Sequence, residues 1–186
     1  MIRRRSALRT RLTAVGYGIF YRLPQKTRLR LVRLATPKYT VGAVVLVFDP
    51  SRERLLLLRQ PPGRGWTLPA GLLNRGETPV EGAVREVAEE TGLAFDAGDL
   101  EPAAPNAVVH TNGRWVDTVF TTHADPATAR LSVDGAEVWE AAWHALADLP
   151  QLTVATQRLL GVYGIGPGAE SLNGAASAPP ESGPSS

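Results

Sequence analysis

Hydrophobic and polar residues follow several distinct patterns between residues 39 and 163. The run 41–48 is almost entirely apolar and rich in β-branched side chains, which predicts a strand buried on both faces. A turn at Asp49-Pro50-Ser51 and a second apolar run over 54–59 predict a hairpin with a second strand, followed by a loop over 60–65. The body of the protein is therefore expected to begin near Tyr39 with a sheet.

The strongest helix prediction covers residues 79–91. Thr78, Pro79 and Glu81 form a capping box, with a threonine N-cap, proline at the first helical position and glutamate three residues after the cap. Gly92 is a natural stop. At 100° per residue, one side of this helix is apolar and is expected to face the core. That side comprises Val80, Val84, Val87 and Thr91, flanked by Ala83 and Ala88.

The second half of the body reads as strands and a final helix. Residues 101–106 are interpreted as a connection broken by prolines, and 108–111 and 114–122 as strands that flank an Asn112-Gly113 hairpin turn. Residues 137–144 predict a last strand, and 152–163 a helix. His110 and His123 lie on the hairpin strands, and we interpret both as structural residues without a catalytic role.

Both ends of the chain differ from the body. Residues 1–20 predict an amphipathic helix with Leu8, Leu12, Val15 and Ile19 on one side, and 24–35 predict a second helix that Pro37 ends. From Gly164 onward, glycine, proline, serine and alanine dominate, so residues 163–186 are expected to form a disordered tail. The expected organisation is a basic helical extension over 1–38, one domain over 39–162, and this tail.

Charge is distributed unevenly. Residues 1–40 hold eleven of the twenty basic residues and none of the eighteen acidic ones, so the remaining nine basic residues share the rest of the chain with every acid. Three interpretations of the basic extension remain: it packs on the body or on a second subunit of a homodimer, it binds an anionic membrane, or it binds nucleic-acid phosphates. The first is favoured.

The amino-acid composition also indicates the cellular compartment in which the protein is expected. The chain contains no cysteine, which excludes a disulfide framework or a thiolate metal site. The apolar runs are too short to span a bilayer, and the N-terminal run does not resemble a secretory signal. A cytoplasmic location is expected.

The predicted helix 79–91 also carries the candidate chemistry. Glu86, Glu89 and Glu90 lie away from its apolar side, with Glu90 nearest the apolar edge, and Arg85 lies four residues from both Glu81 and Glu89. Carboxylates that converge in this way need a cation, and an all-oxygen set suits Mg²⁺ or Mn²⁺. The alternative is a solvated acidic helix face without a ligand.

The segment 71–93, GLLNRGETPVEGAVREVAEETGL, resembles the Nudix signature G-x5-E-x7-R-E-U-x-E-E-x-G-U, where U is aliphatic. Residues 66–71, WTLPAG, resemble the family's W-x-L-P-G-G lead-in, with Ala70 in place of the first glycine. We call 71–93 the signature segment. Its matching residues are Gly71, Glu77, Arg85, Glu86, Val87, Glu89, Glu90, Gly92 and Leu93.

The resemblance covers about residues 39–162 and implies a fold, a reaction and a set of site residues. The fold is α/β, a mixed β-sheet between helices, and the reaction is hydrolysis of a nucleoside diphosphate linked to another group. Glu86, Glu89 and Glu90, with the Gly71 carbonyl, are the implied metal ligands, and Arg85 and Glu77 the residues that orient them. The catalytic base remains open among Glu89, Glu86 and a distant carboxylate such as Glu137.

The substrate is less determined. Arg59 and Arg64, beside the predicted loop, are candidates for contact with a substrate phosphate. Patterns typical of coenzyme A, NADH and dinucleotide hydrolases are not found, which favours a nucleoside triphosphate, including oxidised ones. ADP-ribose or a nucleotide sugar is the alternative substrate, and a non-catalytic nucleotide-binding module is the alternative function.

Overall fold

The computed structural model describes residues 17–18, 20–110, 114–167 and 169, and the chain divides into two units, 1–39 and 40–186. In the first unit, helix α2 (Gln25–Ala35) ends where the Thr36 N–H donates to the Val32 carbonyl at 2.9 Å, and no residue of α2 is buried. This agrees with the helix predicted over 24–35. The apolar positions predicted for the preceding helix, Leu8, Leu12, Val15 and Ile19, lie outside the described residues.

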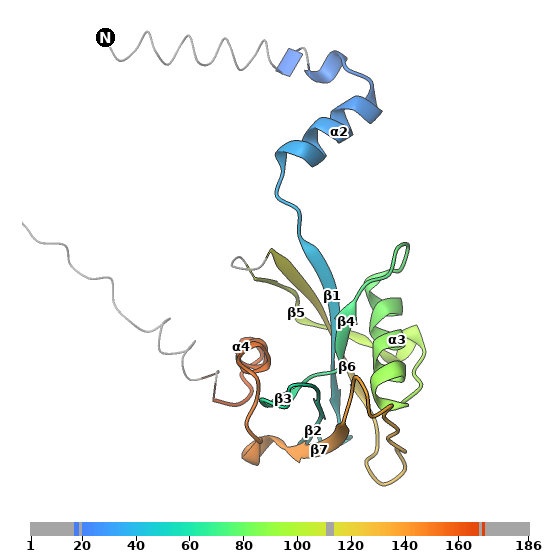
Figure 1. Cartoon of the computed structure of the whole chain (residues 1–186), viewed down its shortest axis with the longest axis vertical. Helices are drawn as coiled ribbons and strands as arrows, with labels where there is room; N and C mark the ends of the chain where they lie inside the picture. Colours follow the sequence, from blue (N-terminus) through green and yellow to red (C-terminus); the bar gives the residue numbers. More distant parts are fainter. Residues whose placement is uncertain (1–16, 19, 111–113, 168, 170–186) are drawn as a thin grey trace, which may run out of the picture. The chain divides into compact units, whose positions relative to one another are not determined.

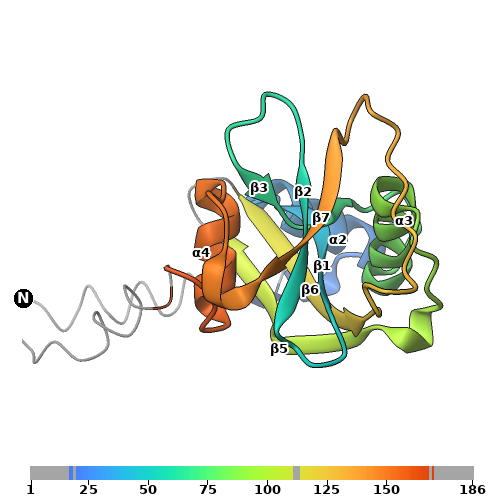
Figure 2. The ribbon, with the colours of Figure 1, turned by 90° about the horizontal axis from the view of Figure 1, so that it is seen from below.

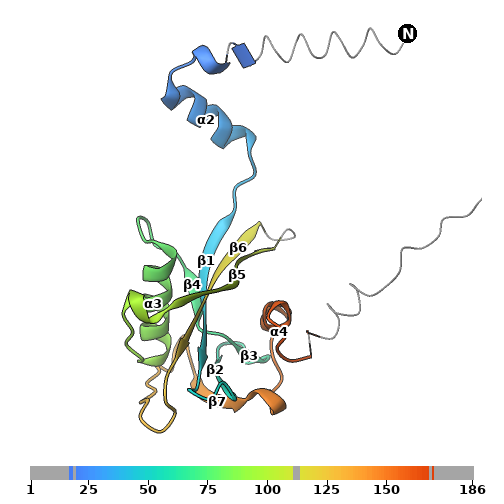
Figure 3. The same cartoon turned by 180° about the vertical axis from the view of Figure 1, so that it is seen from behind.

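The second unit is built around strand β1 (Thr40–Phe48), labelled in Figure 1. On one side β1 pairs in parallel with β6 (Trp115–His123), and on the other it pairs antiparallel with the short β4 (Ala70–Leu72). Beyond β6, strand β5 (Glu101–His110) runs antiparallel to it, and Figure 3 shows the two side by side. The sheet is therefore mixed, as predicted.

A second group of strands joins β1 through the tight turn at Asp49. Strand β2 (Arg54–Arg59) faces β1 at the register pair Phe48 and Leu55 and then pairs antiparallel with both β3 (Trp66–Thr67) and β7 (Glu140–Ala145). The Asp49 carboxylate accepts hydrogen bonds of 2.8 Å from the backbone N–H groups of Glu53 and Arg54, which fixes the turn. Short 3₁₀ turns, Ala97–Asp99 and Leu146–Asp148, precede β5 and follow β7.

Residues of β1 alternate between two cores. Val44, Leu46 and Phe48 are buried with Leu159 and Leu160 of helix α4 (Val154–Val162). Ala43, Val45 and Val47 are buried with Ala83 and Val87 of helix α3 (Pro79–Thr91). The two helices cover opposite faces of the sheet, as Figure 2 shows. The continuous apolar run thus reflects burial on both faces, and the predicted α/β architecture with a sheet between helices is confirmed.

Several sequence predictions differ from the structure. Residues 101–106 belong to β5 and are not a connection; proline is tolerated there because β5 is an edge strand, and the register with β6 shifts between Pro102 and Ala107. The last strand begins at Glu140, so Glu137 lies in the loop before it. Ala88 is exposed although the helical pattern places it beside the apolar side. The turn residues 111–113 lie outside the described residues.

The packed body continues past residue 162. The Tyr163 hydroxyl donates to the Pro105 carbonyl at 2.6 Å, and the Ile165 side chain packs against the core on the α4 side. The packed body therefore includes the first residues of the segment expected to be a tail. In the part of the chain that the structure describes, no helix combines the length and the apolar character needed to cross a membrane.

Candidate active site

Helix α3 begins and ends as its sequence predicts. Thr78 and Glu81 form the reciprocal capping box, in which Glu81 Oε2 accepts from the Thr78 N–H at 2.8 Å, and Gly92 ends the helix with φ of 76°, a left-handed conformation that favours glycine. Ala83 and Val87 are fully buried against the sheet. This packing fixes the rotation of the helix and therefore the directions of its three glutamates.

Arg85 is the centre of an ion-pair network on the exposed side of α3. Its Nε donates to Glu77 Oε1 at 2.8 Å and its Nη2 to Glu77 Oε2 at 3.1 Å, a two-pronged pair. Its Nη1 contacts Glu86 Oε1 at 2.7 Å and Glu89 Oε2 at 3.0 Å, and its Nη2 also donates to the Leu72 carbonyl at 2.9 Å. One guanidinium thus connects both halves of the signature segment.

Of Glu81 and Glu89, which both lie four residues from Arg85, Glu89 pairs with it and Glu81 does not. The Glu81 carboxylate is bound to Thr78 in the cap, so Glu77, eight residues before Arg85, takes that place. Arg85 and the Asn74 N–H hold the pKa of Glu77 down at about 2. Glu77 is therefore ionised across the physiological range and serves to hold Arg85.

Gly71 is required by the close approach of Glu86. A Cβ atom built on Gly71 would overlap the Glu86 carboxyl group, and no positive φ is involved. The Glu86 side chain is only 13% exposed. Any larger residue at position 71 would have to displace this carboxylate from the backbone of β4.

Glu90 is the buried carboxylate of the site, with an exposed fraction of 9%. Its Oε1 accepts from Gln60 Nε2 at 2.7 Å and its Oε2 from the Ala70 N–H at 2.9 Å. Burial raises the pKa of Glu90 to about 7, and the neighbouring charges of Glu86 and Glu137 add to the effect. The sequence-based expectation that Glu90 lies at the apolar edge of the helix is confirmed.

The loop before β7 carries Glu137, whose charge acts on Glu90. The loop is turned by Asp134, whose Oδ1 accepts from the backbone N–H groups of Ala136, Glu137 and Val138 at 3.0 to 3.1 Å. These bonds lower the pKa of Asp134. Glu137 follows the signature segment at a long distance in sequence, beyond both β5 and β6, and its charge contributes to the raised pKa of Glu90.

The carboxylates are held separately in this structure. Glu86 and Glu89 share one nitrogen of Arg85, and Glu90 turns toward Gln60 and Ala70. Within the described residues, no three acidic, histidine or cysteine side chains are gathered closely enough to hold a metal ion. The expected convergence of the three glutamates is not formed here: Arg85 binds Glu86 and Glu89, and Gln60 and the Ala70 N–H bind Glu90.

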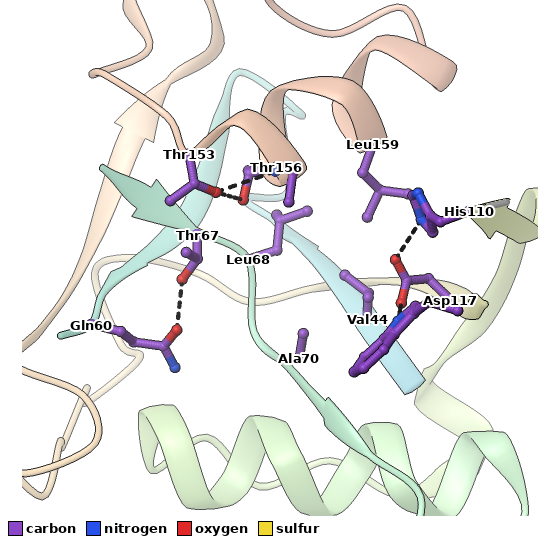
Figure 4. A pocket seen from close by; sticks show the side chains of 12 residues that line it. Val44, Gln60, Thr67, Leu68, Ala70, His110, Asp117, Thr153, Thr156 and Leu159 are labelled. Carbon is purple, nitrogen blue, oxygen red and sulfur yellow. Dashed lines mark hydrogen bonds and ion pairs between the residues drawn. The ribbon is translucent and has the colours of Figure 1, made fainter. Parts of the chain in front are cut away.

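A cavity of about 350 Å³ lies on the α4 face of the sheet, and Figure 4 shows its side chains. Figure 4 shows Gln60 on one side of it and His110 and Asp117 on the other, and Trp115, which bonds to Asp117, also lines it. Sequence reasoning missed Gln60, Trp115 and Asp117, because an isolated glutamine or a tryptophan on a strand carries no motif. The spacing Trp115-x-Asp117, which places both side chains on one face of a strand, was the available signal.

The two arginines suggested as phosphate contacts lie elsewhere. Arg59 is the last residue of β2, Arg64 lies in the loop that follows, and both side chains are exposed. Neither lines the cavity. Their contact with a substrate phosphate stays a prediction.

Comparison with known proteins agrees with this geometry. The sequence model of the NUDIX domain matches residues 38–161. The chain is 35% identical over 131 residues to the human 8-oxo-dGDP phosphatase NUDT18, a match that covers 68% of this chain and 37% of the relative. It is 46% identical over 54 residues to a putative 8-oxo-dGTP diphosphatase of Bacillus subtilis, covering 29% of this chain and 36% of the relative.

A solved structure extends the comparison to the fold. The MutT NUDIX hydrolase of Burkholderia pseudomallei has a TM-score of 0.54 and 30% sequence identity, with 67% of this chain and 97% of that chain covered. The chain belongs to the NUDIX family. It spans well under half the length of the curated relatives that it matches.

The family implies a divalent cation, and the side chains present fit one. Glu86, Glu89 and Glu90 offer carboxylate oxygens, which hard cations such as Mg²⁺ prefer. The absence of a Cβ at Gly71 leaves the Glu86 carboxylate directly against the β4 backbone. Burial and the neighbouring Glu86 and Glu137 charges raise the pKa of Glu90, and a cation would stabilise the ionised form of such a carboxylate.

Proposed function

We propose that this chain hydrolyses the diphosphate linkage of nucleoside diphosphate derivatives in a reaction that requires Mg²⁺ or Mn²⁺. The observation that carries the proposal is the buried Glu90 carboxylate, held by Gln60 and the Ala70 N–H beside the Glu86 and Glu137 charges. Burying a carboxylate near two others is costly unless a cation offsets it. A diphosphate substrate brings further negative charge to the same place.

Glu86, Glu89 and Glu90, with the Gly71 carbonyl, would hold the cation. When bound, the cation neutralises phosphate charge and lowers the pKa of a water molecule that attacks phosphorus. Arg85 orients Glu86 and Glu89 through the ion pairs described above, and Glu77 fixes Arg85 in turn. The proton of the attacking water passes to a carboxylate, for which Glu86, Glu89 and Glu137 are the candidates.

An oxidised nucleoside diphosphate or triphosphate is the substrate we favour. The names of the human and Bacillus subtilis relatives refer to 8-oxo-dGDP and 8-oxo-dGTP, which supports this choice over ADP-ribose or a nucleotide sugar. A panel of dinucleotides, nucleotide sugars, nucleoside triphosphates and oxidised nucleotides, assayed for phosphate and pyrophosphate release with Mg²⁺, decides between them.

The Glu90→Gln variant tests the reaction itself. It keeps the size of the side chain but removes the charge, so we expect a kcat lower by about a hundredfold or more, with the fold retained. Glu101→Gln is the matched control, because Glu101 is an exposed carboxylate at the start of β5 and should leave kcat unchanged. A fully active Glu90→Gln variant refutes the assignment, and nucleotide binding without any product in the unmodified protein favours a binding module.

A further inference from the structure

Two loops carry groups that act on the buried Glu90 carboxylate. The loop after β2, residues 60–65, carries Gln60, which donates to Glu90 Oε1 at 2.7 Å. The loop before β7, residues 132–139, carries Glu137, whose charge acts on Glu90. Figure 2 shows both loops projecting from the same end of the sheet. The surroundings of Glu90 therefore depend on where these two loops are held.

The loop before β7 is bound to the body at both ends, each time beside the Gln60–Glu90 pair. At its start, the Ser132 N–H donates at 2.8 Å to the carbonyl of Thr91, the residue after Glu90. At its end, the Trp139 N–H donates at 2.8 Å to the carbonyl of the last residue of β2, directly before Gln60. The loop thus begins beside one member of the pair and ends beside the other.

The Trp139 side chain contacts the loop after β2 at Gly63. A Cβ atom built on Gly63 would lie 2.8 Å from Trp139 Cζ3, so the indole lies directly against the Gly63 backbone. Gly63 has a φ of 74°, and its N–H donates to the Gln60 carbonyl at 2.7 Å, which closes a turn that begins at Gln60. The indole therefore packs on the turn whose first residue bonds to Glu90.

Core packing does not account for this contact. Val138 is 2% exposed and anchors the end of the loop in the body, whereas the next residue, Trp139, is 47% exposed. A half-exposed indole contributes less to the core than a buried one. Loss of the Trp139 ring should therefore leave the fold in place.

We propose that Trp139 is a positioning residue for the hydrolysis proposed above. Its indole holds the loop after β2 against the loop before β7, so that Gln60 and Glu137 keep their places around Glu90. This inference rests on the proposed function. Trp139 acts through these two side chains and supplies no base of its own, because an indole N–H only donates.

A purely structural role for Trp139 leads to different expectations. If Trp139 only stabilised the fold, its loss would lower Tm, and its effect on kcat would multiply with the effects of other variants. A positioning residue instead lowers kcat at an unchanged Tm. Its loss also matters little once the side chains that it positions have been removed.

Steady-state kinetics with Mg²⁺ and the best substrate of the nucleotide panel separate these two roles. Trp139→Ala should lower kcat about tenfold and change KM less than about threefold. In the double variant Gln60→Ala/Glu137→Gln, the same change should lower kcat by less than about threefold. Trp139→Phe keeps an aromatic ring against Gly63 and should keep kcat within about threefold of the unmodified protein.

Gly63→Ala tests the contact from the other loop. The added methyl group meets the indole, so kcat should fall about tenfold in the unmodified protein and by a smaller factor in the Trp139→Ala variant. Gly164→Ala is the matched control. Gly164 has a φ of 72°, and nothing lies within 4 Å of a Cβ built there, so this variant carries similar backbone strain without the contact and should leave kcat unchanged.

Hydrogen exchange followed by mass spectrometry measures the same contact without any substrate. Trp139→Ala should speed exchange about tenfold or more in the peptide that covers 60–65 and leave the peptide that covers α4 unchanged. An unmodified protein that hydrolyses no nucleotide would refute the proposed function, and the exchange rates would still decide whether Trp139 holds the loop.

Three results overturn the proposal: unchanged kcat in Trp139→Ala, an equal loss of kcat in the unmodified protein and in the double variant, or unchanged exchange over 60–65. If Trp139→Ala does not fold, Gly63→Ala decides, since a kcat equal to that of Gly164→Ala would show that the contact of Trp139 with Gly63 is dispensable.

Discussion

The side-chain amide of Gln60 donates a hydrogen bond of 2.7 Å to Oε1 of Glu90, thirty positions later in the chain. Thr67 Oγ1 donates to the other end of the amide, Gln60 Oε1, at 3.1 Å and so fixes which end faces the glutamate. Gln60 lies in the loop after β2, whereas Glu90 lies in the last turn of α3. The bond therefore connects the cavity to the helix that carries the proposed metal ligands.

Gln60→Ala should lower kcat about tenfold and raise the Mg²⁺ concentration needed for half-maximal rate. Removing the amide leaves a buried carboxylate oxygen of Glu90 without its hydrogen-bond donor, which costs about 1–3 kcal/mol in free energy. The Glu90 side chain is then also free to move. Steady-state assays over a Mg²⁺ titration measure both effects. Thr67→Val, which removes the bond that orients the amide together with a longer bond to the Leu58 carbonyl, should produce a smaller change in the same direction. Unaltered kinetics in Gln60→Ala would mean that Ala70 alone positions Glu90.

Gly71→Ala should reduce kcat/KM by about tenfold or more while the protein remains folded. The added methyl group would overlap the Glu86 carboxyl group, which must then move away from β4 and from the proposed cation. Gly98→Ala is the matched control, because nothing lies within 4 Å of a Cβ at Gly98 and activity should be unchanged. Equal activity of the two variants would show that the contact of Glu86 with Gly71 is dispensable.

Glu77 should make the stability of the protein depend on pH in the acid range. Arg85 lowers the pKa of Glu77 from 4.5 to about 2, so the ionised carboxylate is bound more tightly in the folded state than in the unfolded one. A depressed folded-state pKa contributes stability that is fully present above the unfolded-state value of 4.5 and is lost as the pH falls toward 2. Glu77→Gln should be less stable than the unmodified protein at neutral pH, and the difference should shrink at about pH 3.

Urea unfolding of both proteins at about pH 7, 5 and 3 measures this difference. Glu53→Gln provides the control, since Glu53 is an exposed carboxylate in the turn before β2. Its difference from the unmodified protein should stay close to zero at every pH. A Glu77→Gln difference that stays constant from neutral to acid pH would contradict the role of the Arg85 pair.

Local patterns predicted those parts of the fold that short-range chemistry determines. Helix α3 follows directly from Thr78, Pro79 and Gly92, and β1 from an apolar run that needs two cores. The connection predicted over 101–106 is wrong because proline disfavours a strand locally, whereas pairing with β6 at the sheet edge overrides that preference. The sequence could not reveal that position at the edge.

In the candidate site, too, local patterns predicted some residues, whereas contacts between distant segments determine the others. The signature segment identified its glutamates and Arg85, and the packing of α3 explains why Glu90 is the one among them that is buried. Helical spacing makes Glu81 and Glu89 equal candidates for pairing with Arg85, but the cap takes Glu81, so Arg85 pairs with Glu89 and with Glu77 from the loop. Gln60 lies in the loop after β2, and Trp115 and Asp117 lie on β6, so all three reach the cavity through the packing of distant segments. The spacing Trp115-x-Asp117 is the one local signal that the sequence offers for them.

Glu137→Gln should lower kcat more than Glu140→Gln, although both residues belong to the same acidic stretch. Glu137 is close enough to raise the pKa of Glu90, whereas Glu140 lies in β7 opposite Arg59 with an exposed side chain. Asp134→Ala should lower kcat less than Glu137→Gln and more than Glu140→Gln. Asp134 accepts the three backbone hydrogen bonds that shape the loop, but it does not itself take part in the reaction. Equal losses in Glu137→Gln and Glu140→Gln would exclude Glu137 as the additional carboxylate and leave Glu86 and Glu89 as the candidate bases.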